Sequence, residues 1–199
     1  MLGSGAMTNS IEDITRQADL VMLVGSNPEE AHPVIGMQLR AAVERGCRLI
    51  VVDPRVTWLS SRADYHLRVR PGTDAALAMA MLNTIIEEDL YDHDFVEYWC
   101  YGFEQLAARV AEMPAEKAGE ICGIDPDYIK GAARMYANAK PASLQWGLAF
   151  DQSTNGMQLS HCAICLMALT ANIDVPGGQI LGNANSGQNE TGFGFEEAL

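Results

Sequence analysis

The sequence lacks any apolar run approaching the length of a membrane-spanning helix, and its first residues do not form a basic region followed by an apolar one. A transmembrane helix requires about 20 consecutive apolar residues, and a signal peptide requires those two regions in that order. We therefore expect neither a membrane span nor a signal peptide in this chain.

Basic residues are scarce as well. The chain has 13 Lys and Arg against 26 Asp and Glu, a formal net charge of -13, and basic residues that never cluster. A protein that binds nucleic acid needs a basic patch to neutralise phosphates, so we expect no nucleic-acid partner. With 48% hydrophobic and 20% charged residues, the composition is ordinary for a globular protein with a packed core.

Cysteines do not form a recognisable framework. Three of the five, Cys47, Cys100 and Cys122, lie far apart among apolar neighbours and are predicted to be buried, reduced thiols. Cys162 and Cys165 form a Cys-x-x-Cys, but no second pair exists to complete a tetrahedral metal site. We interpret these two as small apolar residues on one face of a helix.

Two short apolar runs, at residues 20–24 and 49–52, are uncharged and rich in branched side chains. Such runs are typical of parallel strands that are covered on both faces. Each is followed at once by a polar turn, one beginning with Gly25-Ser26-Asn27-Pro28 and the other being Asp53-Pro54-Arg55. Because ligands of open α/β sheets bind at the carboxyl ends of strands, these turns are the first candidates for function.

The remaining periodicity predicts an α/β protein with a three-layer Rossmann-like, mostly parallel sheet, helices on both faces and a helical insertion. Residues 65–69 and 142–150 are predicted as further strands. Helices are predicted over residues 11–18, 34–44, 74–88 and 155–171, the third being nearly apolar all round and therefore buried. The insertion covers about 92–139, with breaks at Gly102, Pro114 and Gly123, and residues 176–194 are predicted as a loop.

Six motifs in fixed order resemble the molybdopterin oxidoreductase (dimethyl sulfoxide reductase) family. They are Gly-Ala-Met-Thr-Asn at 5–9, Gly-Ser-Asn-Pro-x-x-x-His-Pro at 25–33, Val-Asp-Pro-Arg at 52–55, Arg-Pro-Gly-Thr-Asp at 70–74, Leu-x-x-Leu-Thr-x-Asn-x-Asp-x-Pro-Gly-Gly at 166–178 and Gly-Gln-Asn at 187–189. The resemblance covers nearly the whole chain. It implies a catalytic subunit that holds molybdenum or tungsten between two molybdopterin guanine dinucleotides.

The resemblance further implies that the chain is one of the two Rossmann-like domains that each grip a guanosine diphosphate end of the cofactor. Residues 1–182 are expected to form this domain, and residues 183–199 a glycine-rich segment that leads into a missing one. The remaining domains of the same subunit and an iron–sulfur electron-transfer subunit are the expected partners.

In the family, an iron–sulfur cluster and the Cys, selenocysteine or Ser that ligates the metal lie upstream of the matched region. None of the five cysteines here matches that ligand, so we expect the isolated chain to bind no metal and to be inactive. A reading frame that starts at an internal Met just after a selenocysteine codon, or a domain cut out deliberately, would begin where this sequence does. The cellular location, cytoplasmic or exported, stays open.

Several turn residues have two interpretations. The resemblance implies that Gly25, Ser26 and Asn27 face a pyrophosphate or the pterin, whereas a bare tight turn is the alternative. Asp53 is interpreted as an acceptor for a ribose hydroxyl or the guanine edge, or else as a turn-forming Asp before Pro54. For Arg55, the two options are contact with a phosphate and a surface ion pair.

The segment Pro71-Gly72-Thr73-Asp74 matches the guanine-recognition loop of the family, with Asp74 on the guanine edge; helix capping is the alternative. His32 contacts the cofactor or is a packed or capping residue, while His66, His93 and His161 are assigned to structure. The other cofactor-binding candidates, for which loop hydrogen bonding is the alternative, are Asn9, Gly147, Gln152, Gln188 and Asn189.

The acidic charge of the chain conflicts with an anionic cofactor. We therefore expect binding to depend on backbone amides, local dipoles and arginines such as Arg55, Arg62 and Arg70. In formate dehydrogenases of the family an Arg precedes Gly-Gln-Asn, and here that residue is Ser186, which argues against formate as the substrate. Residues 146–152 look more like the acetylene hydratase and aromatic dehydroxylase branch.

Two rival functions differ from this interpretation. An ordinary NAD-binding domain is disfavoured because Gly25-Ser26-Asn27-Pro28 stands where Gly-x-Gly-x-x-Gly is expected. A non-catalytic α/β binding or assembly module that has kept the fold and lost the metal centre is the alternative function. A metal-ligating residue upstream distinguishes the enzyme from this module.

Overall fold

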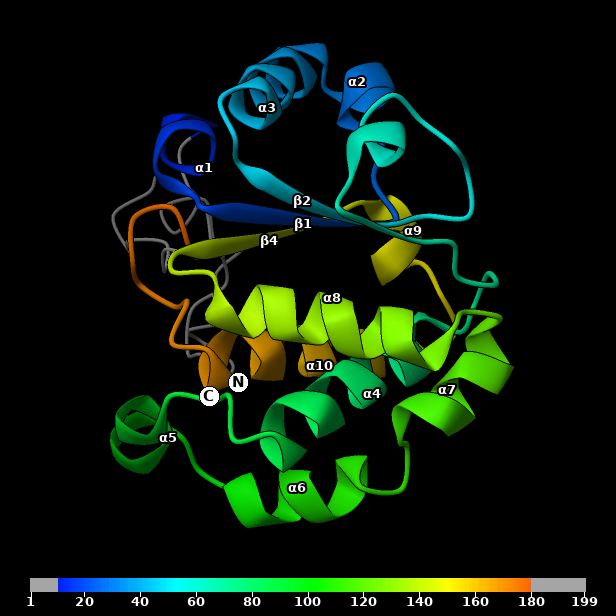
Figure 1. The fold of residues 1–199 in the computed structure, drawn as a ribbon, viewed down its shortest axis with the longest axis vertical. Coiled ribbons are helices and arrows are strands. Elements are labelled where there is room, and N and C mark those ends of the chain that lie inside the picture. The colour runs from blue at the N-terminus through cyan, green and yellow to red at the C-terminus, as the bar shows by residue number, and fades with distance from the viewer. Residues whose placement is uncertain (1–10, 180–199) are drawn as a thin grey trace, which may run out of the picture.

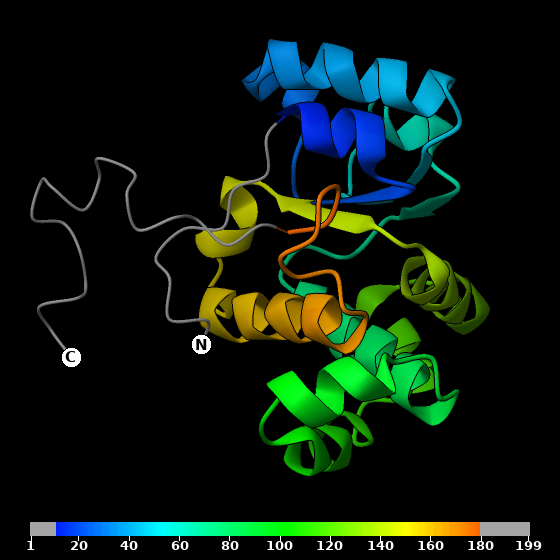
Figure 2. The same cartoon turned by 90° about the vertical axis from the view of Figure 1, so that its left-hand side faces the viewer.

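The computed structural model describes residues 11–179, and within them four strands form one parallel sheet in the order β3-β2-β1-β4. The strands are β1 (Leu20–Val24), β2 (Arg48–Val52), β3 (Tyr65–Leu67) and β4 (Ala142–Trp146). The sheet lies between two layers of helices, which Figure 1 shows edge-on and Figure 2 shows from the side. The predicted three-layer α/β fold is thus confirmed.

The central strand β1 is buried along its whole length, as the apolar run at residues 20–24 predicted. Its side chains alternate between two apolar clusters. Met22 and Val24 belong to the larger cluster, and Val21 and Leu23 to the smaller one on the opposite face. This alternation is the two-residue period of a strand, and it explains why the run contains no polar residue.

The smaller cluster is covered by α1 (Ile11–Gln17) and α3 (Pro33–Glu44), with Leu39 of α3 fully buried against the sheet. Glycine at position 36 lets the short helix α2 (Pro28–Ala31) pack on α3, since a Cβ there would lie 2.8 Å from Glu29 Cα. Figure 1 shows these three helices above the sheet.

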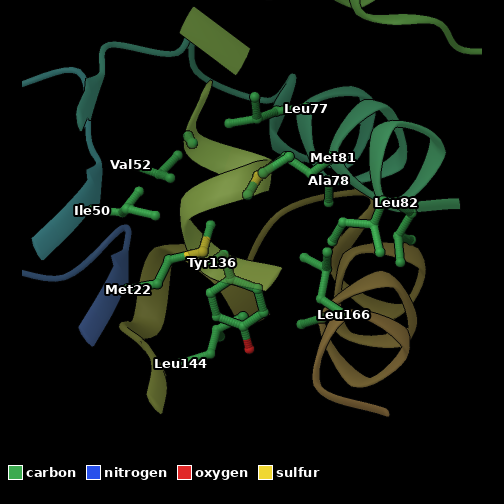
Figure 3. Close-up of a cluster of buried hydrophobic side chains, with 14 of the residues drawn as sticks. Met22, Ile50, Val52, Leu77, Ala78, Met81, Leu82, Tyr136, Leu144 and Leu166 are labelled. Atoms are coloured by element: carbon green, nitrogen blue, oxygen red, sulfur yellow. The ribbon is translucent and has the colours of Figure 1, made fainter. Parts of the chain in front are cut away.

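The opposite face is covered by α4 (Asp74–Glu87), α8 (Pro126–Asn138) and α10 (Gly156–Leu169). Figure 3 shows Met22 and Leu144 of the sheet meeting Met81 of α4 and Leu166 of α10 in this interior. Helix α4 packs against α6, α7, α8 and α10, so the prediction that this nearly apolar helix is buried is confirmed.

The helical stretch predicted for residues 92–139 consists of α5 (His93–Trp99), α6 (Phe103–Val110), α7 (Ala115–Cys122) and α8. The predicted breaks at Gly102, Pro114 and Gly123 all separate helices, and both glycines have a positive φ that favours glycine. Buried residues of α8 belong to the main core, so this last helix of the predicted insertion also covers the sheet. The domain boundaries themselves stay a prediction.

Two predicted strands are shorter than expected. β3 ends at Leu67 instead of Val69, and β4 ends at Trp146, after which α9 (Leu148–Asp151) begins. The prediction of strand through Phe150 was wrong because a short apolar run has no period that separates strand from buried helix. The ring of Phe150 stacks on Trp146 at 5.1 Å, so the apolar residues of both elements share one core.

Two loops also contain short helices. Residues 25–33 include α2, and residues 53–64 include the 3₁₀ helix η1 (Ser60–Arg62). Pro28 and Pro33 each stand at the first position of a helix, where the missing N–H is not needed. The turn predicted after β1 therefore contains the starts of two successive helices, α2 and α3.

All five cysteines are free thiols. Cys122 is buried as predicted, whereas Cys47 and Cys100, which were also predicted to be buried, are half-buried. Cys162 and Cys165 pack from α10 against the larger cluster, and burial raises the pKa of Cys165 to about 11. In the part of the chain that the structure describes, no helix combines the length and apolarity that a membrane crossing requires.

Candidate functional site

The connections that leave the sheet diverge on either side of β1. The chain runs outward from β1 to β2 and β3, and then returns through α4 to α8 to place β4 on the other side of β1. In open α/β sheets, ligands bind at the carboxyl ends of strands beside such a switch in strand order. The loops after β1 and β4 meet at this point, to the right of the sheet in Figure 1.

Gly25 and Gly147 bring these two loops into contact. Gly25 N donates to Val52 O at 2.8 Å, and Gly147 N donates to Val24 O at 3.0 Å, so each loop extends the ladder of a neighbouring strand. A Cβ at position 147 would collide with the Gly25 carbonyl oxygen, and Gly25 itself has φ +57. Glycine is thus required at position 147 by the close approach of backbone to backbone, and is favoured at position 25 by the positive φ.

Asn27 has the most informative polar group in the first loop. It is the N-cap residue of α2, yet its side chain makes no capping hydrogen bond. Among residues 11–179, its buried Oδ1 has no hydrogen-bond partner. A buried acceptor left unpaired costs about 1–3 kcal/mol, so an orphan of this kind calls for an explanation such as a missing ligand donor. Ser26 beside it is half-buried.

Asp53 follows β2 directly and is only 2% exposed. Its Oδ1 accepts from Arg55 N at 2.8 Å and from Arg55 Nε at 3.2 Å, while Oδ2 accepts from Arg55 Nη2 at 3.2 Å. The hydrogen bonds that Asp53 accepts from the Arg55 side chain raise the pKa of Arg55. The turn and the ion pair that the sequence left as alternatives are therefore both present around Pro54.

The neighbouring strand β3 supports this turn. His66 Nε2 lies 2.9 Å from the Asp53 carbonyl oxygen, and Arg68 Nε donates to Pro54 O at 3.4 Å. Sequence reasoning assigned His66 to structure and did not single out Arg68. The signal was their spacing of two within the run at residues 65–69, because residues two apart in an extended chain lie on one face; β3 itself ends at Leu67, just before Arg68.

Asp74 is the first residue of α4 and is half-buried. The N-cap residue Thr73 makes no capping bond with its side chain and instead donates Oγ1 to Arg70 O at 2.7 Å. Burial raises the pKa of Asp74, the amides of Asp74 and Gly72 lower it, and the charge of Asp53 raises it further. Asp53 and Asp74 therefore lie on the same edge of the sheet and within electrostatic reach.

Beneath Asp74 a small cavity of about 20 Å³ extends between the sheet and the helices α4, α9 and α10. Its other walls are apolar and include Val24, Val52 and Phe150. A space of this size holds about one water molecule. Asp74 lines this cavity, so its carboxylate lies between the apolar interior and the carboxyl ends of the strands.

Other predicted residues lie at the rim or elsewhere. Pro71 and Gly72 are exposed, with φ +84 at Gly72, and Gln152 is exposed after α9. His32 is exposed between α2 and α3, where its carbonyl accepts from Gly36 N. The described residues do not include Asn9, Gln188 or Asn189.

Two arginines expected near an anion have protein partners. Arg70 donates Nη1 to the carbonyl oxygens of Glu120 at 2.8 Å and Ile121 at 3.2 Å, at the end of α7. Arg62 stacks on the Trp58 ring at 3.7 Å, and Arg40 covers the same ring at 3.9 Å. Of the three arginines expected near an anion, Arg55 is the one whose contacts join it to the candidate site.

Over residues 11–179, no group of three or more His, Cys, Asp and Glu side chains is arranged to hold a metal ion. The carboxyl edge of the sheet instead offers oxygen acceptors at Asn27, Asp53 and Asp74, with the cations of Arg55 and Arg68 at the turn after β2. Such a set suits a ligand that carries several N–H or O–H donors together with a negative charge.

Comparisons with known proteins were consistent with one family. A family model described as molybdopterin oxidoreductase matches residues 2–196. The F420-dependent formate dehydrogenase subunit alpha of Methanocaldococcus jannaschii is 40% identical over 187 residues, covering 94% of this chain and 27% of that protein. Acetylene hydratase of Syntrophotalea acetylenica is 46% identical over 148 residues, covering 74% of this chain and 20% of that protein.

A solved structure agrees with the fold. The acetylene hydratase from Pelobacter acetylenicus superposes with a TM-score of 0.81 at 40% identity, over 90% of this chain and 24% of that one. The chain thus spans between a fifth and about a quarter of the length of these relatives.

Proposed function

Because the chain belongs to the molybdopterin oxidoreductase family, as its motifs predicted, we propose that the carboxyl edge of its sheet holds the guanosine diphosphate end of a molybdopterin guanine dinucleotide. Enzymes of this family use a molybdenum or tungsten pterin cofactor, and the relatives include formate dehydrogenases and nitrate reductases. The dinucleotide form of the cofactor is part of the proposal.

The observation that carries the proposal is the gathering of acceptors at one edge of the sheet. The buried Oδ1 of Asn27 has no partner in the described chain, and the Asp53 and Asp74 carboxylates lie within electrostatic reach of each other. Guanine presents a ring N–H and an amino group side by side, and ribose presents two hydroxyls. Carboxylates accept hydrogen bonds from such donors, and the two negative charges repel each other less once those donors are in place.

Each residue then has a role in binding. Asp74 and Asp53 accept from the base and the ribose, Asn27 accepts from a donor that reaches the first loop, and Arg55 faces the diphosphate. Gly25 and Gly147 keep the two loops close and free of side chains at the point where they cross. The bound metal would supply the redox chemistry, while these residues hold and orient the cofactor.

The remaining features of the whole protein follow from this role. We infer a two-electron redox or oxygen-atom transfer reaction, further domains of the same subunit, an iron–sulfur cluster and an electron-transfer partner. Because the chain spans only about a quarter of its relatives, we expect no turnover from it alone. Substrate-dependent reduction of a dye by the 199-residue chain would contradict this expectation.

Nucleotide binding to this chain tests the proposal directly. Calorimetry should show binding of guanosine diphosphate, weaker binding of inosine diphosphate, which lacks the amino group, and weaker binding still of adenosine diphosphate. Asp74→Asn should weaken guanosine diphosphate binding about tenfold and should weaken inosine diphosphate binding by a smaller factor. Asp151→Asn, at an exposed carboxylate of α9, is the matched control and should change neither affinity. Equal affinities for the three nucleotides would rule out guanine recognition.

A further inference from the structure

We propose that Arg55 is a counter-ion clasp: without ligand its guanidinium closes over Asp53, and on binding it moves to the diphosphate and releases Asp53 to the nucleoside. This rests on the proposed function, because Arg55 is paired with the diphosphate and Asp53 with the nucleoside of the same ligand. The clasp consists of the contacts that the Arg55 guanidinium makes with the Asp53 carboxylate.

The two partners of the clasp differ sharply in burial. The Asp53 side chain is 3% exposed, whereas the Arg55 side chain is 58% exposed. Both Nε and Nη2 of Arg55 donate to the carboxylate, one to each oxygen. The guanidinium therefore forms the outer cover of a carboxylate that is otherwise enclosed by protein, and a ligand that uses Asp53 must displace it.

Displacement of the guanidinium leaves part of the turn intact. Arg55 N also donates to Asp53 Oδ1 at 2.8 Å, and His66 Nε2 lies 2.9 Å from the Asp53 carbonyl oxygen. These contacts involve the backbone and β3, so they do not depend on where the Arg55 side chain lies. After release, Oδ2 loses its contact with Nη2 and is available to ligand donors.

The charges around the clasp explain why release needs a second partner. The charge of Glu30 in α2 acts on Arg55, the charge of Asp53 acts on Asp74, and Arg68, the residue after β3, donates to Pro54 O in the same turn. A buried carboxylate that loses its cation without compensation is strongly disfavoured. A diphosphate attracts the freed guanidinium at the same time as the nucleoside donors replace it on Asp53, so the two replacements stabilise each other.

This coupling separates a clasp from two simpler roles of Arg55. An arginine that only binds phosphate would not affect guanosine, which carries no charge. An arginine that only supports the turn would weaken guanosine and guanosine diphosphate alike on removal. A clasp competes with guanosine for Asp53, so its removal should strengthen guanosine binding while it weakens guanosine diphosphate binding.

Calorimetric titration of the 199-residue chain with guanosine, guanosine diphosphate and inorganic pyrophosphate provides the test. Arg55→Met keeps the aliphatic stem and removes the donors. We expect guanosine to bind about threefold tighter and guanosine diphosphate about tenfold more weakly than to the parent chain. Arg62→Met removes the arginine that stacks on Trp58 and should produce no such opposite shifts.

A second measurement uses the parent chain without relying on a variant. Saturating pyrophosphate should raise guanosine affinity severalfold, and guanosine should raise pyrophosphate affinity by the same factor, because linkage is reciprocal. In Arg55→Met the coupling should vanish. If the parent binds guanosine and guanosine diphosphate but shows no coupling, the clasp is overturned and the proposed function stands. Failure to bind either nucleoside form overturns both.

Discussion

Two helices of the 92–139 stretch, α5 and α8, differ from two helices that begin at the carboxyl edge of the sheet, α2 and α4, in how their first turns are capped. Asp92 and Asp125 cap α5 and α8 by accepting from Phe95 N and Asp127 N. The side chains of Asn27 and Thr73, at the starts of α2 and α4, make no such bond. An N-cap side chain satisfies an otherwise unpaired helix amide, so the starts of α2 and α4 keep hydrogen-bonding capacity that α5 and α8 have used internally.

Ion pairs show the same contrast. Arg134 of α8 binds Glu88 at the end of α4 through two contacts of 2.7 Å. Lys140, which follows α8, binds Asp92 at 2.8 Å. Both partners of each pair are open to solvent. Such pairs typically contribute about 0–1 kcal/mol. At the sheet edge the Asp53 carboxylate is buried under an exposed guanidinium. Because α8 also packs its buried residues into the main core, we expect the 92–139 stretch to contribute mainly to stability and the sheet edge to bind a partner.

The largest expected effect separates stability from binding. Ile129 of α8 is fully buried, so Ile129→Ala should lower the free energy of unfolding by about 2–5 kcal/mol in urea titrations. The affinity of the folded fraction for guanosine diphosphate should not change. Glu120→Ala, at an exposed position of α7, is the control and should alter neither quantity. A loss of affinity in folded Ile129→Ala would contradict the division between the two regions.

At the sheet edge, Gly147→Ala should affect both properties. The new Cβ would collide with the Gly25 carbonyl oxygen, and overpacking of this kind costs about 1–3 kcal/mol. Because the loops after β1 and β4 must move apart, nucleotide affinity should fall too. Gly46→Ala supplies a comparison, since φ +100 at Gly46 strains alanine although nothing lies within 4 Å of its Cβ. That variant should lose stability but not affinity.

The capping contrast gives a smaller, matched effect. Asp125→Ala should destabilise the chain by about 1 kcal/mol, because it removes the bond to Asp127 N. Thr73→Ala should change stability by no more than about 0.5 kcal/mol, the usual range for surface substitutions, since Thr73 caps no helix amide with its side chain. Thermal or urea unfolding measures both. Equal losses would show that the start of α4 is capped like that of α8.

The smallest effect is a pair of opposite pH dependences. The hydrogen bond from Lys140 lowers the pKa of Asp92 in the folded protein. The charged Asp92 carboxylate therefore stabilises the fold at pH values above its unfolded pKa of about 3.9. This stabilisation is lost as pH falls through the folded pKa. Burial raises the pKa of Asp74, so folding with this carboxylate charged carries a penalty that is relieved as pH falls through the folded pKa towards about 3.9.

Substitution by asparagine should reveal the opposite effects of these two carboxylates on the free energy of unfolding. At pH 7, Asp92→Asn should reduce the free energy of unfolding, and Asp74→Asn should increase it although it weakens guanosine diphosphate binding. Both differences from the parent should shrink once the carboxylates are protonated. Urea titrations between pH 3 and pH 7 measure this. A stabilising Asp92→Asn or a destabilising Asp74→Asn at pH 7 would reverse the assignment.

Features that depend on neighbouring residues were predictable. The strands at residues 20–24 and 49–52 and the helix breaks at Gly102 and Gly123 were all confirmed, because period and φ preference act within a few residues. The end of β4 was missed because a buried strand and a buried helix share the same apolar composition.

By itself, the amino-acid sequence determined the family, the order of the elements and the turns at which the candidate site lies, since motifs and local periodicity are written along the chain. Only the tertiary structure decided that Gly147 must accommodate Gly25, that Asp74 lies within reach of Asp53, and that Arg70 is engaged at the end of α7. These contacts join residues far apart along the chain. They arise from the packing of the sheet and its two helical layers, which no local pattern records.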